Sequence, residues 1–136
     1  MTVGLDTSVA LRLVTGTPAD QAERARILVA TSREPVAVSD LVVSELYFAL
    51  RHHYAVPHAE TVSVMRKFLG DPRIRCSGVA RNVLVADDGS RTSRKTGLMD
   101  RWILADYARD GVELRTFDRE LARLPGARHA TDTLAE

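Results

Sequence analysis

The feature that most constrains the fold of this chain is the alternation of short apolar runs with longer segments of helical periodicity. The strand-like runs are residues 3–5, 36–38, 74–76 and 114–117. The helical segments are a short one capped by Ser8, then 18–31, 40–54, 58–69, 79–86, 99–109 and 118–124. Strands that alternate with helices predict an α/β domain built around a mainly parallel sheet. The ligand site of such a sheet lies beyond the carboxyl ends of its strands.

Length and composition indicate one globular domain covering residues 1–136. Hydrophobic residues make up 45% of the chain and charged residues 27%, a balance typical of folded proteins. No apolar run approaches the ~18–20 residues of a membrane-spanning helix, and the first residues lack the basic segment of a secretory signal. A single cysteine, Cys76, excludes an internal disulfide. We therefore expect a cytoplasmic protein. The net charge of +1 does not by itself indicate a nucleic-acid binder.

Two aspartates follow strand-like runs directly. Asp6 comes after residues 3–5, and Asp118 comes after residues 114–117. Carboxylates that leave neighbouring parallel strands meet at one edge of the sheet, where a ligand site is expected. The alternative is that each aspartate caps the helix that follows it, which is a common role for this residue type. The sequence leaves both roles open for each residue.

Two further acids lie on predicted helices. Asp100 points into the apolar stripe of its helix, which contains Ile103, Leu104, Tyr107 and Ala108. A carboxylate aimed at a core costs several kcal/mol unless it is paired or bound to a cation, so Asp100 requires compensation. A first-turn aspartate favoured by the helix dipole is the simpler alternative. Glu45 lies beside the apolar stripe of its own helix, which comprises Val42, Leu46, Ala49, Leu50 and His53.

The chemistry of these four acids matters more as a set than singly. Carboxylates gathered without matching cations repel one another, and a hard divalent cation relieves that repulsion. Oxygen-only ligands suit Mg²⁺ or Mn²⁺ rather than zinc or copper. Such ions activate water near neutral pH and stabilise the attacking and leaving oxygens of a phosphodiester displacement. The set therefore predicts a metal-dependent phosphodiesterase site.

Four motifs carry a resemblance to a known family. They are Leu5-Asp6-Thr7-Ser8, Val43-Ser44-Glu45-Leu46, the segment 99–105 and the segment 111–118. In order, spacing and structural context they resemble the PIN domain, specifically the VapC-type toxin ribonucleases of bacterial toxin–antitoxin pairs. Each motif alone is weak, but four in register along the whole chain are a specific signal.

The resemblance implies a three-layer α/β/α fold and an Mg²⁺-dependent endoribonuclease, with Mn²⁺ as a substitute ion. It also implies a homodimer, inhibition by a small cognate antitoxin, and operator DNA binding only through the antitoxin complex. By the match of motifs, Asp6 and Asp100 are direct metal ligands, whereas Glu45 and Asp118 either bind a second ion or act through water. The supporting polar positions that match are Thr7 and Thr116.

A basic, glycine-bounded segment covers residues 89–97 and is no signature of this family. We hypothesise that its Arg91, Arg94 and Lys95 hold RNA phosphates, the alternative being a solvated loop. Trp102 lies opposite the apolar stripe of its helix and is expected to face a partner or RNA.

Several other α/β classes are excluded by single residues near the first strand. A haloacid-dehalogenase-like phosphatase needs a second Asp two residues after the first, where this chain has Ser8. A receiver domain needs an acidic pair there, and a dinucleotide-binding domain needs a glycine-rich turn. The alternative that stays open is a non-catalytic PIN-like binding module that acts through antitoxin and operator complexes.

Overall fold

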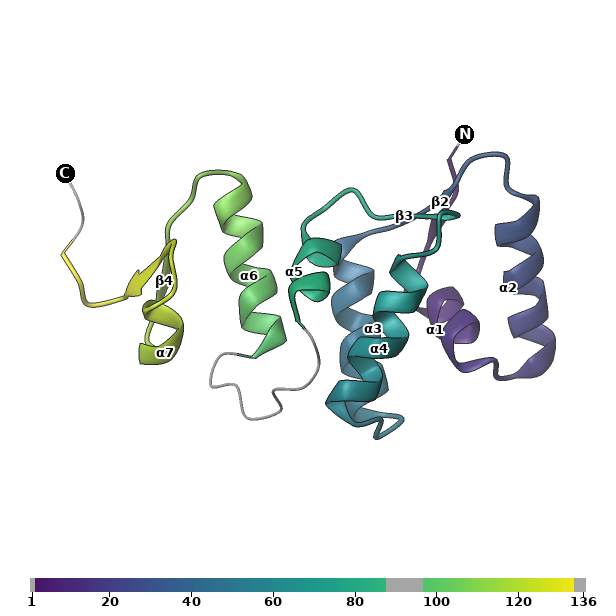
Figure 1. The fold of residues 1–136 in the computed structure, drawn as a ribbon, viewed down its shortest axis with the longest axis horizontal. Helices are drawn as coiled ribbons and strands as arrows, with labels where there is room; N and C mark the ends of the chain where they lie inside the picture. The colour runs from purple at the N-terminus through teal and green to yellow at the C-terminus, as the bar shows by residue number, and fades with distance from the viewer. Residues whose placement is uncertain (1, 88–96, 134–136) are drawn as a thin grey trace. The chain divides into compact units, whose positions relative to one another are not determined.

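The computed structural model describes residues 2–87 and 97–133. The chain divides into two compact units, Met1–Thr92 and Ser93–Glu136, and each contains a small sheet with helices (Figure 1). All strand pairings in the described residues are parallel, which agrees with the predicted α/β class. No helix formed by the described residues is long and apolar enough to cross a membrane.

The sheet of the first unit sets the position of Asp6. Its strands are β1 (Gly4–Leu5), β2 (Val36–Val38) and β3 (Ile74–Arg75), in the order β1-β2-β3. Leu5 is in register with Val38, so the residues that follow these two strands leave the sheet at the same edge. This is the carboxyl edge, where the ligand site of a parallel sheet is expected.

Five helices complete the first unit. They are α1 (Thr7–Thr15), α2 (Ala19–Thr31), α3 (Asp40–His52), α4 (His58–Leu69) and α5 (Ala80–Ala86). The pair α1 and α2 and the pair α3 and α4 lie side by side (Figure 1). The core between sheet and helices is aliphatic, and its most completely buried side chains include Val36, Leu46, Met65 and Leu84. Burial of these side chains is the main favourable contribution to folding of this unit.

The start of α5 is tied to the start of α3 by one carboxylate. Ser39 caps α3 through a hydrogen bond from the amide of Val42, at 3.3 Å. Asp40 therefore does not serve as that cap. Instead, its carboxylate accepts hydrogen bonds from the amides of Val79 at 3.0 Å and Ala80 at 3.2 Å. The amides at the start of a helix are donors that the helix itself does not satisfy, and Asp40 accepts from two of them.

Gly78 gives Asp40 the space for this contact, so Gly78→Ala is expected to destabilise the protein by about 2 kcal/mol. A Cβ atom at residue 78 would lie 2.2 to 2.4 Å from the Asp40 carboxylate, which must then move away from both amides. Urea denaturation measures the change. Gly4→Ala is the control, because its added Cβ meets only the Ala37 carbonyl, at 3.9 Å. Equal stability of the two variants would show that the Asp40 contact contributes little.

The second unit contains α6 (Leu98–Arg109), β4 (Leu114–Thr116), α7 (Arg119–Ala122) and β5 (Ala127–His129). Strands β4 and β5 pair in parallel, with Leu114 opposite Ala127. The small core of this unit consists of one residue from each element and one from the segment after α7: Leu104, Leu114, Leu121, Ala127 and Leu124. The strand β5 was not among the predicted elements, because Ala127-Arg128-His129 shows no apolar alternation.

The predicted apolar stripe of α6 is wrong in part. Leu104 packs in the core of the second unit, as expected. Ile103 and Tyr107 are each 45% exposed, whereas Leu98 and Trp102 are buried. Leu98 and Trp102 share a helix face because they are separated by about one turn, and the indole has the largest apolar surface to bury. The expected contact of Trp102 with RNA or a partner stays a prediction.

Candidate functional site

Asp6 lies at the carboxyl end of β1 and begins α1. Its Oδ1 atom accepts hydrogen bonds from the Ser8 hydroxyl at 2.6 Å and from the Val9 amide at 3.3 Å. Asp6 is therefore the N-cap of α1, and the prediction that Ser8 caps this helix is wrong. The helix α1 begins at Thr7, directly after Asp6, so Ser8 lies in its first turn. The Ser8 hydroxyl donates back to Asp6.

The same contacts keep Asp6 anionic. The hydrogen bond from the Ser8 hydroxyl lowers the pKa of the Asp6 carboxyl, and the Val9 amide and the charge of Arg12 lower it further. The side chain is exposed to solvent. An exposed carboxylate with a lowered pKa stays charged at mildly acidic pH, as a ligand for a hard cation must.

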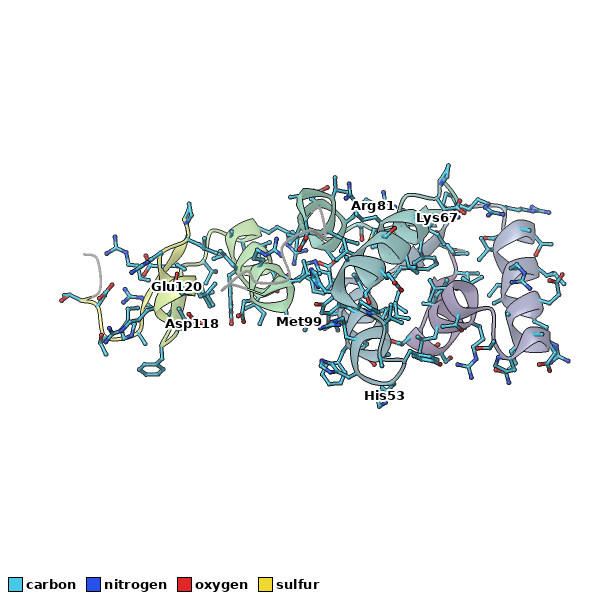
Figure 2. The ribbon with its side chains drawn as sticks, turned by 60° about the horizontal axis from the view of Figure 1, so that its bottom comes forward. His53, Lys67, Arg81, Met99, Asp118 and Glu120 are labelled. Atoms are coloured by element: carbon cyan, nitrogen blue, oxygen red, sulfur yellow. The ribbon has the colours of Figure 1, made fainter. Side chains whose placement is uncertain are left out.

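Asp118 repeats this arrangement in the second unit. Its Oδ1 atom accepts hydrogen bonds from the amides of Glu120 at 2.9 Å and Leu121 at 3.1 Å, and it caps α7. Figure 2 shows Asp118 and Glu120 together at the start of this helix. The hydroxyl of Thr116 accepts a hydrogen bond from the Asp118 amide at 3.0 Å. Thr116 thus contacts the backbone from which Asp118 projects, and its supporting role in the site stays a prediction.

Both aspartates cap their helices with Oδ1 alone. The hydrogen bonds from the Ser8 hydroxyl and the Val9 amide to Asp6, and from the amides of Glu120 and Leu121 to Asp118, all reach Oδ1. The capping role considered from the sequence is therefore real, and it leaves a second oxygen on each carboxylate for another ligand. An oxygen donor of this kind fits Mg²⁺ or Mn²⁺.

Glu45 and Asp100 have a different environment. Glu45 is exposed on α3, and Asp100 is partly buried in the first turn of α6. Among residues 2–87 and 97–133, neither side chain has a hydrogen-bond or ion-pair partner. Many other acids of this chain do pair with arginine: Asp71 with Arg73, Asp106 with Arg109, and Glu113 with Arg115 and Arg128. The predicted ligands are thus carboxylates whose charge no described cation neutralises by direct contact.

The four predicted acids are distributed over both units. Asp6 and Glu45 belong to the first unit, and Asp100 and Asp118 to the second. No group of three or more acidic, histidine or cysteine side chains is gathered as a metal site among the described residues. Their assembly into one site stays a prediction. Thr7 is the first residue of α1, and its side chain makes no hydrogen bond to the described parts of the chain.

The basic residues predicted to contact RNA, Arg91, Arg94 and Lys95, lie outside the described residues. Their role therefore stays a hypothesis.

A polar group that the sequence analysis missed lies inside the first unit. The Tyr47 hydroxyl and the His58 Nδ1 atom are 2.8 Å apart, and His58 Nε2 lies 3.7 Å from Oδ2 of Asp87. Asp87 is only 1% exposed. The three residues come from α3, α4 and the end of α5, so they link helices that are distant in the sequence. No local spacing connects these positions, and only the packing of the helices brings them together.

Comparison with known proteins places the chain in a family. No curated protein matches it. The profile of the PIN domain matches residues 3–127. PIN domains are typically metal-dependent nucleases, and the parallel strand pairing and seven described helices agree with the predicted three-layer α/β/α class. Because the match covers nearly all of the 136 residues, the chain belongs to the PIN domain family.

Proposed function

We propose that this protein is a metal-dependent endoribonuclease that hydrolyses RNA phosphodiester bonds with Mg²⁺ held by Asp6, Glu45, Asp100 and Asp118. The observation that carries the proposal is the shared state of Asp6 and Asp118. Each caps its helix through one carboxylate oxygen and is exposed to solvent, so the carboxylate is accessible to a cation. Membership of the PIN family supports the same chemistry.

The residues divide into ligands and positioning groups. Asp6 and Asp100 are proposed as direct ligands, and Glu45 and Asp118 either hold a second ion or act through water. Ser8 and the Val9 amide fix the orientation of the Asp6 carboxylate, and Thr116 orients the backbone at Asp118. Bound Mg²⁺ supplies positive charge for the phosphate oxygens and lowers the pKa of a water molecule. The protein's own contribution is to hold the ligand oxygens in fixed directions.

The wider role that we propose is that of a VapC-type toxin. The motifs around Asp6, Glu45, Asp100 and Asp118 support it. In this proposal the protein is a cytoplasmic homodimer, and a cognate antitoxin neutralises it. The toxin–antitoxin complex, rather than the toxin alone, binds operator DNA.

The test is RNA cleavage by the purified protein with Mg²⁺, with Mn²⁺ and with EDTA. We expect cleavage of internal phosphodiester bonds with either ion and none with EDTA, because the carboxylates alone do not activate water. Activity that returns when Mg²⁺ is added back in excess of EDTA excludes irreversible unfolding as the cause of the loss. Cleavage that EDTA leaves unchanged would contradict the proposal. A folded protein that cleaves neither structured nor unstructured RNA with any ion would favour the alternative of a non-catalytic binding module.

A further inference from the structure

A pocket opens between α1 and α2 on the first unit. Its volume is about 270 Å³. Its apolar wall includes Val9, Ala25 and Leu28. Leu28 is 38% exposed, so a ligand in the pocket can contact it. The volume lies just below the ~300–1,000 Å³ typical of sites for drug-sized ligands. The pocket therefore has room for one flat ring system.

Two arginines lie at the same pocket. Arg12 donates hydrogen bonds to Oε1 of Gln21 at 2.8 Å and to the carbonyl of Ser8 at 3.4 Å, which fixes the plane of its guanidinium. Arg24 also lines the pocket and is exposed, and no described carboxylate pairs with it. Guanidinium groups bind phosphate and stack on nucleobases, so this rim is complementary to a nucleotide. The amide of Gln21 adds a polar group that can contact the edge of a base.

The pocket is also close to Asp6. Ser8 lines the pocket, and its hydroxyl donates to Oδ1 of Asp6 at 2.6 Å. The Ser8 side chain thus lies between the pocket and Asp6, which is a proposed metal ligand. A base held in the pocket would carry its phosphate toward the carboxyl edge of the sheet, where the strand β1 ends at Leu5.

We infer that this pocket is a nucleobase subsite, which binds one base of single-stranded RNA beside the bond to be cut. The apolar wall of Val9, Ala25 and Leu28 covers the face of the base, and Arg12 and Arg24 hold the adjoining phosphates. The inference rests on the proposed ribonuclease function for the identity of the ligand. It assigns a determinant of RNA recognition to α1 and α2, separately from the acids.

The experiment measures binding of a single-stranded RNA octanucleotide in EDTA, so that no cleavage is needed. Backbone amide shifts of the full ¹⁵N-labelled chain locate the ligand, and a titration gives the dissociation constant. We expect shifts at Val9, Ala25 and Leu28. Leu28→Ala should weaken binding about tenfold, because one base contact contributes ~1–3 kcal/mol. Arg24→Glu should weaken it at least as much and reduce its dependence on salt.

Two matched controls lie outside the pocket. Ile27→Ala removes a neighbouring aliphatic side chain of α2 that is 51% exposed, and Arg33→Glu makes the same charge change as Arg24→Glu. Both controls should bind RNA as the wild type does. An acidic, leucine-containing peptide is titrated in parallel, and stronger binding of that peptide at the pocket would assign it to a protein partner and overturn the inference.

The remaining outcomes separate the subsite from the proposed activity. The subsite is wrong if the octanucleotide does not bind, or if it changes amide shifts only at residues outside the pocket. It is also wrong if the pocket variants and the controls bind the octanucleotide with equal affinity. If the wild type nevertheless cleaves RNA with Mg²⁺, the ribonuclease proposal stands without the subsite. Conversely, binding at Val9, Ala25 and Leu28 by a protein that never cleaves RNA would support the subsite and contradict the catalytic proposal.

Discussion

Replacing Asp6 by asparagine is expected to lower Mg²⁺-dependent RNA cleavage by at least about a hundredfold while the protein stays folded. Loss of one charged ligand removes several kcal/mol of stabilisation from the metal site and its transition state, and each 1.36 kcal/mol corresponds to about tenfold in rate. Asparagine is as good an N-cap as aspartate, and its carbonyl can still accept the bonds from Ser8 and Val9. Initial cleavage rates and a thermal melt of the same preparation measure the two effects.

Asp20→Asn is the matched control for Asp6→Asn. Asp20 is an exposed aspartate in the first turn of α2, so its replacement changes the net charge equally near another helix start. We expect this variant to retain the full rate. Asp118→Asn should also stay folded, because asparagine can accept the same capping bonds from Glu120 and Leu121. A fully active Asp6→Asn variant would remove Asp6 from the proposed site, and an unfolded one would assign it a structural role instead.

Replacing His58 by leucine is expected to have the largest effect on stability, about 3 kcal/mol and on the order of 10 °C in the melting midpoint. The substitution removes the imidazole that contacts the Tyr47 hydroxyl at 2.8 Å and faces the carboxylate of Asp87 at 3.7 Å. Asp87 is 1% exposed, so the side chain that replaces the imidazole lies in a part of the first unit that solvent does not reach. Thermal and urea denaturation give the change.

His53→Leu provides the comparison for His58→Leu, because His53 is an exposed histidine just after α3. A surface substitution of this kind changes stability by less than about 0.5 kcal/mol. Tyr47→Phe should lie between the two variants, at about 1 kcal/mol, since it removes one hydroxyl and keeps the ring. A His58→Leu variant as stable as His53→Leu would show that the contact with Asp87 does not contribute to folding.

Most elements of this fold could be predicted because the sequence marks their ends. The helix His58–Leu69 follows Pro57 and ends before Gly70, and its observed bounds are those predicted. The strand β5 carries no such signal, because three residues of mixed character become a strand only by pairing with β4. The apolar face of α6 was wrong in part for a similar reason. Apolar periodicity favours Ile103 and Tyr107, but both side chains are 45% exposed.

The candidate site was less accessible to sequence reasoning than the fold. The pattern placed Asp6 and Asp118 after strands, and the structure adds that Oδ1 of each is the cap. Whether a carboxylate turns back to cap its own helix depends on its side-chain rotamer, which no spacing encodes. The contact between Asp40 and α5 was missed because it joins residues about 40 positions apart.

The capping bonds of Asp6 and Asp118 have a thermodynamic consequence for cation binding. A carboxylate on a free side chain must give up rotational freedom when it binds an ion, and that loss subtracts from affinity. In both aspartates the backbone amides at the helix start have already restricted χ1 and χ2. The Ser8→Ala variant lacks the hydroxyl that donates to Asp6, so its Asp6 side chain has more rotational freedom. Calorimetry should therefore show a smaller entropic penalty for Mg²⁺ binding to the wild type than to this variant.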